Sequence, residues 1–327
     1  MLRNLFDRGL WWKEFRQARL MLLAMLVVGF FALPYTHIRY YSIMQSGEIY
    51  GELMHIIREL KETPAGFWMV TDLLSSFLST MIVMSLILAI YQLGLERHAH
   101  RQELSFSLPY SRSQMYITKL LIGVTFIVIS ILINVLLDIV MLYALDFSFM
   151  MMWEDYVTYI GKLLLVVLSA YSIGMFVGTI SGSLVAHIAF TFVVIYYPEF
   201  IRWSFRTVSH LYEISILQNY NHYPLTTYFF DMQYGSYPSL FILLVTIGLG
   251  IVHYRFNHAE HNGKWVVVPI WEKILIIGFA ISSGLFFGFY VYHQHYSGKI
   301  GYGIGFGVGL LIGYVMIKLL NRLRVRF

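Results

Sequence analysis

The chain has 327 residues, of which 58% are apolar and only 13% charged, and its formal net charge is +5. A soluble domain of this length cannot bury that much hydrophobic surface, so the composition indicates a membrane protein. The absence of cysteine excludes disulfides, thiolate metal sites and cysteine nucleophiles.

About eight apolar stretches follow one another along the chain, most of them long enough to cross a hydrocarbon layer of about 30 Å as a helix. Backbone amides in lipid must be paired within the chain, and the stretches lack the alternating pattern of membrane strands. The sequence therefore predicts an all-α polytopic membrane protein with about eight transmembrane helices. The predicted spans are residues 20–37, 70–94, 118–145, 160–181, 184–201, 238–254, 274–293 and 300–317.

The loops differ in charge on the two sides of the predicted spans. If residue 1 lies in the cytoplasm, most of the 23 Lys and Arg residues fall on the cytoplasmic side, and most acids fall on the other. The positive-inside rule therefore predicts that both termini are cytoplasmic. The net positive charge is explained by anionic lipid headgroups, so no nucleic-acid partner is expected.

Residues 1–19 precede the first span and are amphipathic. Their apolar arc is formed by Trp11, Trp12, Phe15 and Ala18, and their polar arc by Lys13, Arg16 and Gln17. This pattern predicts a helix in the cytoplasmic interface, whose simplest role is that of an anchor. In the external loop 38–69, apolar residues at helical spacing between Glu48 and Glu62 predict a second short amphipathic helix.

The loop between the second and third spans, residues 95–119, carries the most local signals. Pro109 disfavours helix at Leu108, and Ser111 with Gln114 predicts a capping box that begins the third span. Before the proline, Glu96 to Phe106 is expected to form a short charged helix. Such a helix could offer a surface to a soluble partner, or the loop could simply be solvated and cap two helices.

Two polar residues lie deep in the third predicted span. Asn134 and Asp138 are one turn apart on one face, and a charge at mid-bilayer costs roughly 3 kcal/mol on insertion scales. Asp138 must therefore face protein or water. It could line a transport path, make a hydrogen bond between helices, or lie close enough to the external surface to be wet, and we favour the helix contact.

Small residues recur at four-residue spacing in two later spans, which lets helix backbones approach closely in lipid. These residues are Ala170, Gly174, Gly178 and Gly182, then Gly301, Gly305, Gly309 and Gly313. We expect them to pack helices within the subunit rather than to form a dimer interface. The 12 histidines show no metal-binding spacing, so no metal site is predicted. The aromatic external segment 202–237 is expected to lie at the interface.

The order of these features resembles the permease subunits of ABC-2 type, or type V exporter-like, transporters. The motif residues that carry the resemblance are Glu96, Arg97, Glu103, Leu104, Leu108, Pro109, Ser111, Arg112 and Lys119. The resemblance implies that their segment is a coupling helix seated in a groove of an ATPase, and that residues 1–19 form the connecting helix. It also implies a six-helix core over residues 20–254.

Two features depart from the common pattern of that family. His100 and Arg101 stand where the family usually has Gly-Thr, and residues 255–327 add a cytoplasmic link, two further spans and a basic tail. Permeases with such an extension look most similar to the Ytr-type subunits of Gram-positive bacteria. The resemblance thus implies a multi-pass protein of the bacterial cytoplasmic membrane.

The chain contains no phosphate-binding GxxxxGK[ST] loop, so an energy source must come from elsewhere. We expect an ABC ATPase subunit in trans that holds ATP and Mg, a second permease half that is a copy or a paralogue, and no cofactor on this chain. The expected function is ATP-driven export of a hydrophobic or amphipathic lipid-like, peptide or cell-envelope-active compound. The alternatives are a membrane-embedded enzyme that acts on lipid, using Asp138 and a loop histidine, and a non-transporting sensor or scaffold.

Overall fold

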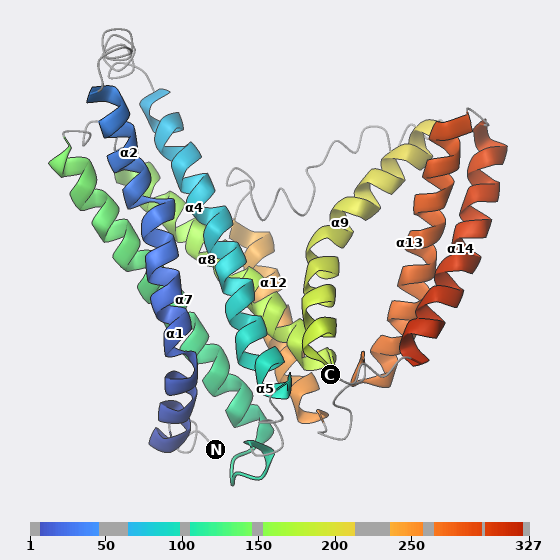
Figure 1. Ribbon diagram of the computed structural model, residues 1–327, viewed down its shortest axis with the longest axis horizontal. Helices are drawn as coiled ribbons and strands as arrows, with labels where there is room; N and C mark the ends of the chain where they lie inside the picture. Colours follow the sequence, from blue (N-terminus) through green and yellow to red (C-terminus); the bar gives the residue numbers. More distant parts are fainter. Residues whose placement is uncertain are drawn as a thin grey trace. The chain divides into compact units, whose positions relative to one another are not determined.

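The computed structural model describes residues 7–45, 65–98, 105–145, 153–212, 236–257, 265–295 and 298–322 (Figure 1). These residues are almost entirely helical, and they form two compact units. The helices are α1 (Arg8–Ala32), α2 (Pro34–Gln45), α4 (Ala65–Ala89), the π-helix η2 (Ile90–Gly94), α5 (Leu95–His98), α7 (Arg112–Ala144), α8 (Trp153–Ile180), α9 (Leu184–Tyr212), α12 (Ser236–Arg255), α13 (Pro269–His295) and α14 (Gly298–Arg322).

Seven of the described helices are long and apolar enough to cross a membrane. The count rises to eight if the two halves of α9, Leu184–Tyr197 and Glu199–Ser209, are one span. These halves are bent by 42° around Pro198, as expected where a proline removes a helical hydrogen bond. The predicted all-α polytopic fold is confirmed.

The first unit comprises α1, α2, α4 and α7 with most of α8 and α12. In it α1 lies against α7 and α4, and α2 continues along α7 (Figure 1). The break between α1 and α2 falls at Leu33, directly before Pro34, whose ring suits the first position of a helix. Two polar caps, at Asp7 and Ser111, begin α1 and α7.

The second unit contains α5, α9, α13 and α14. The last two helices form a hairpin and run side by side along their whole length (Figure 1). An isolated antiparallel bridge between Ser181 and Val266 joins the end of α8 to the segment before α13. There the backbone N–H of Val267 donates to the carbonyl of Ile180 at 2.9 Å.

Two helix starts differ from the boundaries expected from hydropathy. Helix α1 runs unbroken from Arg8 into the first span, because no proline interrupts it, and its interfacial placement stays a prediction. Helix α7 begins at Arg112, six residues before the expected span, because its cap and not its hydropathy determines the start. The predicted helix over residues 48–62 lies outside the described residues. Residues 213–235 of the predicted interfacial segment 202–237 lie outside them as well.

Candidate coupling region and buried polar sites

The predicted coupling segment begins as a direct continuation of the second span. Helix α4 passes through η2 into α5 without a loop, and both Glu96 and Arg97 are buried, at 2% and 5% exposure. The hydroxyl of Ser105 donates to Oε1 of Glu96 at 2.5 Å. Glu96 therefore holds the returning chain in place, and its side chain is not part of a solvated surface.

The other predicted coupling residues are distributed differently. Pro109 and Ser111 are exposed, and Leu108 and Arg112 are half-buried, so the end of the segment is the accessible part of what the structure describes. Glu103 and Leu104 lie outside the described residues. The contact of this segment with an ATPase stays a prediction.

One carboxylate joins the start of α1 to the residue before the cap of α7. Oδ1 of Asp7 accepts hydrogen bonds from the backbone N–H of Gly9 at 2.8 Å and of Leu10 at 3.1 Å. The same oxygen accepts from the hydroxyl of Tyr110 at 2.8 Å. These hydrogen bonds lower the pKa of Asp7, and the bond from Tyr110 has the largest effect. The hydrogen bond to Asp7 in turn raises the pKa of Tyr110.

Helix α7 begins with the predicted capping box. The backbone N–H of Gln114 donates to Oγ of Ser111 at 3.3 Å, and the backbone N–H of Ser111 donates to Oε1 of Gln114 at 2.8 Å. Two backbone donors that a helix start leaves without an internal partner are satisfied in this way. The predicted capping box is confirmed.

A buried polar network within the first unit connects residues of α1, η2, α7 and α8. Nζ of Lys119 on α7 lies 2.6 Å from Oε2 of Glu14 on α1, and both residues are buried. The carbonyl of Lys119 accepts from Nε2 of Gln92 at 3.0 Å, and Oε1 of Gln92 accepts from the hydroxyl of Tyr171 on α8 at 2.6 Å. Gln92 lies in η2, only a few residues before Glu96.

One feature of the sequence could have indicated this network. Leu10, Glu14 and Ala18 follow at four-residue spacing, and all three are buried, so Glu14 lies on the buried stripe of α1. An acid at such a position needs a partner, and Lys119 provides it. Nothing in the pattern around Gln92 indicated a π-helix, although such turns are frequent at functional sites.

Asp138 is completely buried and is held by side chains from two other helices. Its Oδ1 lies 2.5 Å from Nδ1 of His37 on α2, and its Oδ2 accepts from the hydroxyl of Tyr156 on α8 at 3.0 Å. Asn134, one turn earlier, donates to the carbonyl of Ser130 at 2.8 Å and packs beside Gly29 of α1. This is the geometry of a helix contact, and a place on a transport path stays a prediction.

The small residues lie where helices of this chain approach one another. A Cβ on Gly174 would lie 2.8 Å from Ala89, and one on Gly178 would lie 2.7 Å from both His187 and Leu93. In the last hairpin Gly301 is buried, and Gly305, Gly309 and Gly313 of α14 face Phe287, Ser283 and Ala280 of α13. The backbone N–H of Gly182 donates to the carbonyl of Trp265 at 3.1 Å.

Within the described parts of the chain, no group of three His, Asp or Glu side chains could hold a metal ion. The interactions found are instead hydrogen bonds and ion pairs between long apolar helices. The fold and these contacts together define a polytopic helical membrane protein with polar contacts buried between its spans.

Comparison with known proteins shows which kind of membrane protein the chain resembles. The chain is similar to the probable ABC transporter permease YtrD of Bacillus subtilis (strain 168), with 27% identity over 334 aligned positions. The alignment covers 95% of this chain and 97% of that permease. The predicted resemblance to the Ytr-type permeases is thereby confirmed. No family model matches the chain, and no solved structure matches it significantly.

Proposed function

We propose that this chain is the transmembrane permease subunit of an ATP-driven ABC exporter. The observation that carries the proposal is the similarity to a probable ABC permease over nearly the whole length of both chains. It favours a transport subunit over a membrane-embedded enzyme that acts on lipid. The nucleotide is hydrolysed by a separate ATPase subunit, because the sequence contains no phosphate-binding loop.

The buried network provides a physical route from the coupling segment into the membrane helices. A force on residues 95–119 acts directly on η2, because α5 continues η2 without a break. Gln92 then passes the displacement to α7 through the Lys119 carbonyl, and to α8 through Tyr171. The ion pair between Lys119 and Glu14 transmits the same displacement from α7 to α1.

The transported compound is hydrophobic or amphipathic, such as a lipid-like molecule, a peptide or a cell-envelope-active compound. The aromatic composition of residues 202–237 supports this class. Transport requires a second permease half, which is a copy of this chain or a paralogue. The assembly lies in the bacterial cytoplasmic membrane with both termini of this chain in the cytoplasm.

The proposal is tested by purifying the chain together with the products of its neighbouring genes and asking whether an ATPase co-elutes. We expect a complex whose ATPase activity depends on the permease. The double variant Glu103→Lys/Leu104→Asp should remain folded but lose ATPase binding or turnover. Glu154→Lys is a control for the Glu-to-Lys charge reversal, because Glu154 is exposed and predicted to lie on the opposite side of the membrane.

Two results would contradict the proposal. If no ATPase co-purifies under conditions in which the permease remains folded, the chain is not part of such a transporter. If the double variant recovers the ATPase completely and stimulates it as the parent does, the coupling role of residues 95–119 is wrong.

A further inference from the structure

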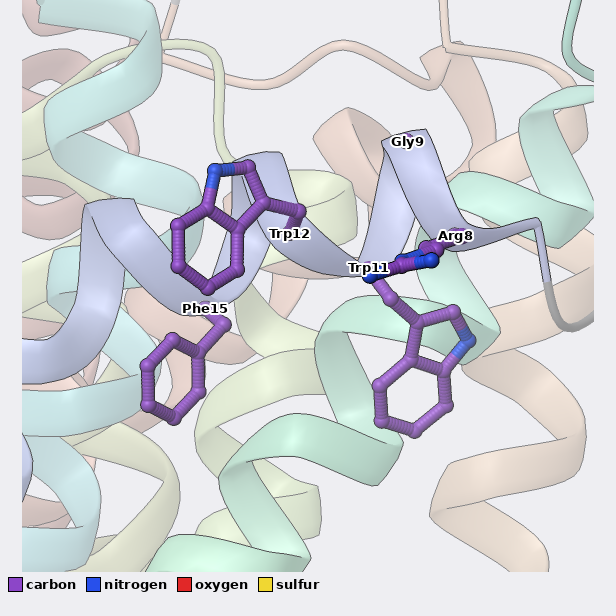
Figure 2. A pocket seen from close by; sticks show the side chains of 5 residues that line it. All are labelled: Arg8, Gly9, Trp11, Trp12 and Phe15. Atoms are coloured by element: carbon purple, nitrogen blue, oxygen red, sulfur yellow. The ribbon is translucent and has the colours of Figure 1, made fainter.

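The first two turns of α1 carry a shallow groove with a volume of about 760 Å³. Arg8, Gly9, Trp11, Trp12 and Phe15 line it, and Figure 2 shows the Trp12 and Phe15 rings on one side and the Trp11 ring on the other. The Trp12 side chain is 64% exposed and Phe15 is 39% exposed. Such exposure of large aromatic groups suits an amphipathic environment.

The aromatic side of the groove is held in place by α7. The rings of Trp12 and Phe15 stack with their centroids 6.2 Å apart. Phe15 also makes an edge-to-face contact of 5.7 Å with Phe126, which is buried on α7. Phe15 is therefore held against a second helix, and Trp12 is held through its stacking on Phe15.

Positive charge surrounds this surface. Arg8, Arg16 and Arg19 are exposed, and the described residues include no acid that pairs with them. The two acids of the same segment are already engaged, Asp7 with Tyr110 and the helix N–H groups, and Glu14 with Lys119. The three guanidinium groups are thus available to an anion from outside the chain.

Along α1 the exposed surface changes from cationic and aromatic to apolar, as a phospholipid changes from its headgroup to its acyl chains. Arg8, Trp12, Arg16 and Leu20 follow at four-residue spacing, and Phe15, Arg19, Leu23 and Val27 form the adjacent row. Beyond Arg19 the exposed residues are apolar, with Leu20 at 64% exposure, Leu23 at 58% and Phe31 at 56%. The boundary between cationic and apolar surface marks the level of the headgroups.

We propose that this surface is a binding site for an anionic diacyl phospholipid. Arg8, Arg16 and Arg19 bind the phosphate and the negative charge of the headgroup, because guanidinium groups pair with phosphate through two parallel hydrogen bonds. Trp12 and Phe15 lie among these arginines and flank the headgroup, and the acyl chains lie along Leu20 to Phe31. The site stabilises α1 against α7 and is independent of the transport function proposed above.

Tryptophan quenching tests the proposal directly. The full-length chain in a nonionic detergent is titrated with phosphatidylglycerol or phosphatidylcholine whose acyl chains are brominated. We expect tighter binding of phosphatidylglycerol, and a weakening of about fivefold for Arg8→Gln and about 25-fold for Arg8→Gln/Arg16→Gln, from the usual effect of a basic residue near an anionic lipid surface. Inorganic phosphate should not compete, because it has no acyl chains.

Lys273→Gln is the matched control, since Lys273 is exposed on α13 and its replacement removes the same charge elsewhere. The control should bind phosphatidylglycerol as the parent does. Equal binding of both lipids, or unchanged binding by the double arginine variant, overturns the proposal. The proposal is also wrong if a purified ATPase subunit or a second permease copy protects Trp12 from a soluble quencher where phosphatidylglycerol does not.

Discussion

Two buried carboxylates in the first unit show how single residues join its helices. Asp138 has a partner at each oxygen, His37 and Tyr156, and Glu14 has Lys119 at 2.6 Å. Between apolar helices such a group remains charged only if its neighbours compensate for the water it loses. Each carboxylate therefore depends on a particular arrangement of two or three helices, and that arrangement depends on it.

Replacing Asp138 with alanine should destabilise the protein. The variant leaves the hydroxyl of Tyr156 and the ring nitrogen of His37 without their partner, at a cost of about 1 to 3 kcal/mol in the free energy of unfolding. Thermal unfolding in detergent measures the effect, and Asp138→Asn, which keeps a side-chain oxygen, is the milder control. If Asp138→Ala keeps full stability and assembly but loses substrate-stimulated ATPase activity, Asp138 lies on the transport path instead.

The pair of Glu14 and Lys119 should show strong coupling between its two members. Lys119→Met leaves a buried carboxylate without its cation, and breaking a buried pair in this way costs about 3 to 5 kcal/mol. The double variant Glu14→Leu/Lys119→Met removes both charges and should recover most of that stability. A double variant whose loss equals the sum of the two single losses would show that the ion pair does not connect α1 with α7.

At the scale of helices, hydropathy predicted where the spans lie, but polar contacts determine how they begin and join. Ser111 and Gln114 could be recognised because their spacing is local. The partners of Asp138 could not, because His37 lies 101 positions away and the two meet only through the packing of α2 on α7. Likewise, the hydrogen bond between Ser105 and the buried Glu96 could not be predicted, because a helical pattern over residues 96–106 does not indicate that these two side chains meet.

The hairpin of α13 and α14 depends on glycines at one face of the last helix. A Cβ on Gly309 would collide with the backbone carbonyl of Ser283, whereas one on Gly307 would meet nothing within 4 Å. We expect Gly309→Ala to lower the free energy of unfolding by about 1 to 3 kcal/mol through overpacking. Gly307→Ala is the matched control and should be neutral or stabilising by up to about 1 kcal/mol, because alanine favours helix. Equal melting temperatures of the two variants would refute this account of the hairpin.

At the scale of the whole chain, the number of membrane crossings depends on α9. If Leu184–Tyr197 and Glu199–Ser209 together form one bent span, the described helices provide eight spans, which place the two ends on one side. If α9 enters the membrane and returns, the described helices provide seven spans, which place the ends on opposite sides. The distribution of Lys and Arg supports the first arrangement, because it places Arg255, Lys318 and Arg322 on the side of residue 1.

Single cysteines can decide between these arrangements, since the chain has none of its own. In intact cells, Ser148→Cys and Ser236→Cys should react with an impermeant thiol reagent, while Ser107→Cys and Asn262→Cys should react only after the membrane is opened. Ser107 is exposed, unlike Ser105, which is buried against Glu96, so protection at position 107 reports the membrane and not the fold. If intact cells are labelled at positions 148 and 262 but not at position 236, α9 turns back within the membrane. Labelling of 107 from outside would reverse the whole orientation and place residues 95–119 out of reach of a cytoplasmic ATPase.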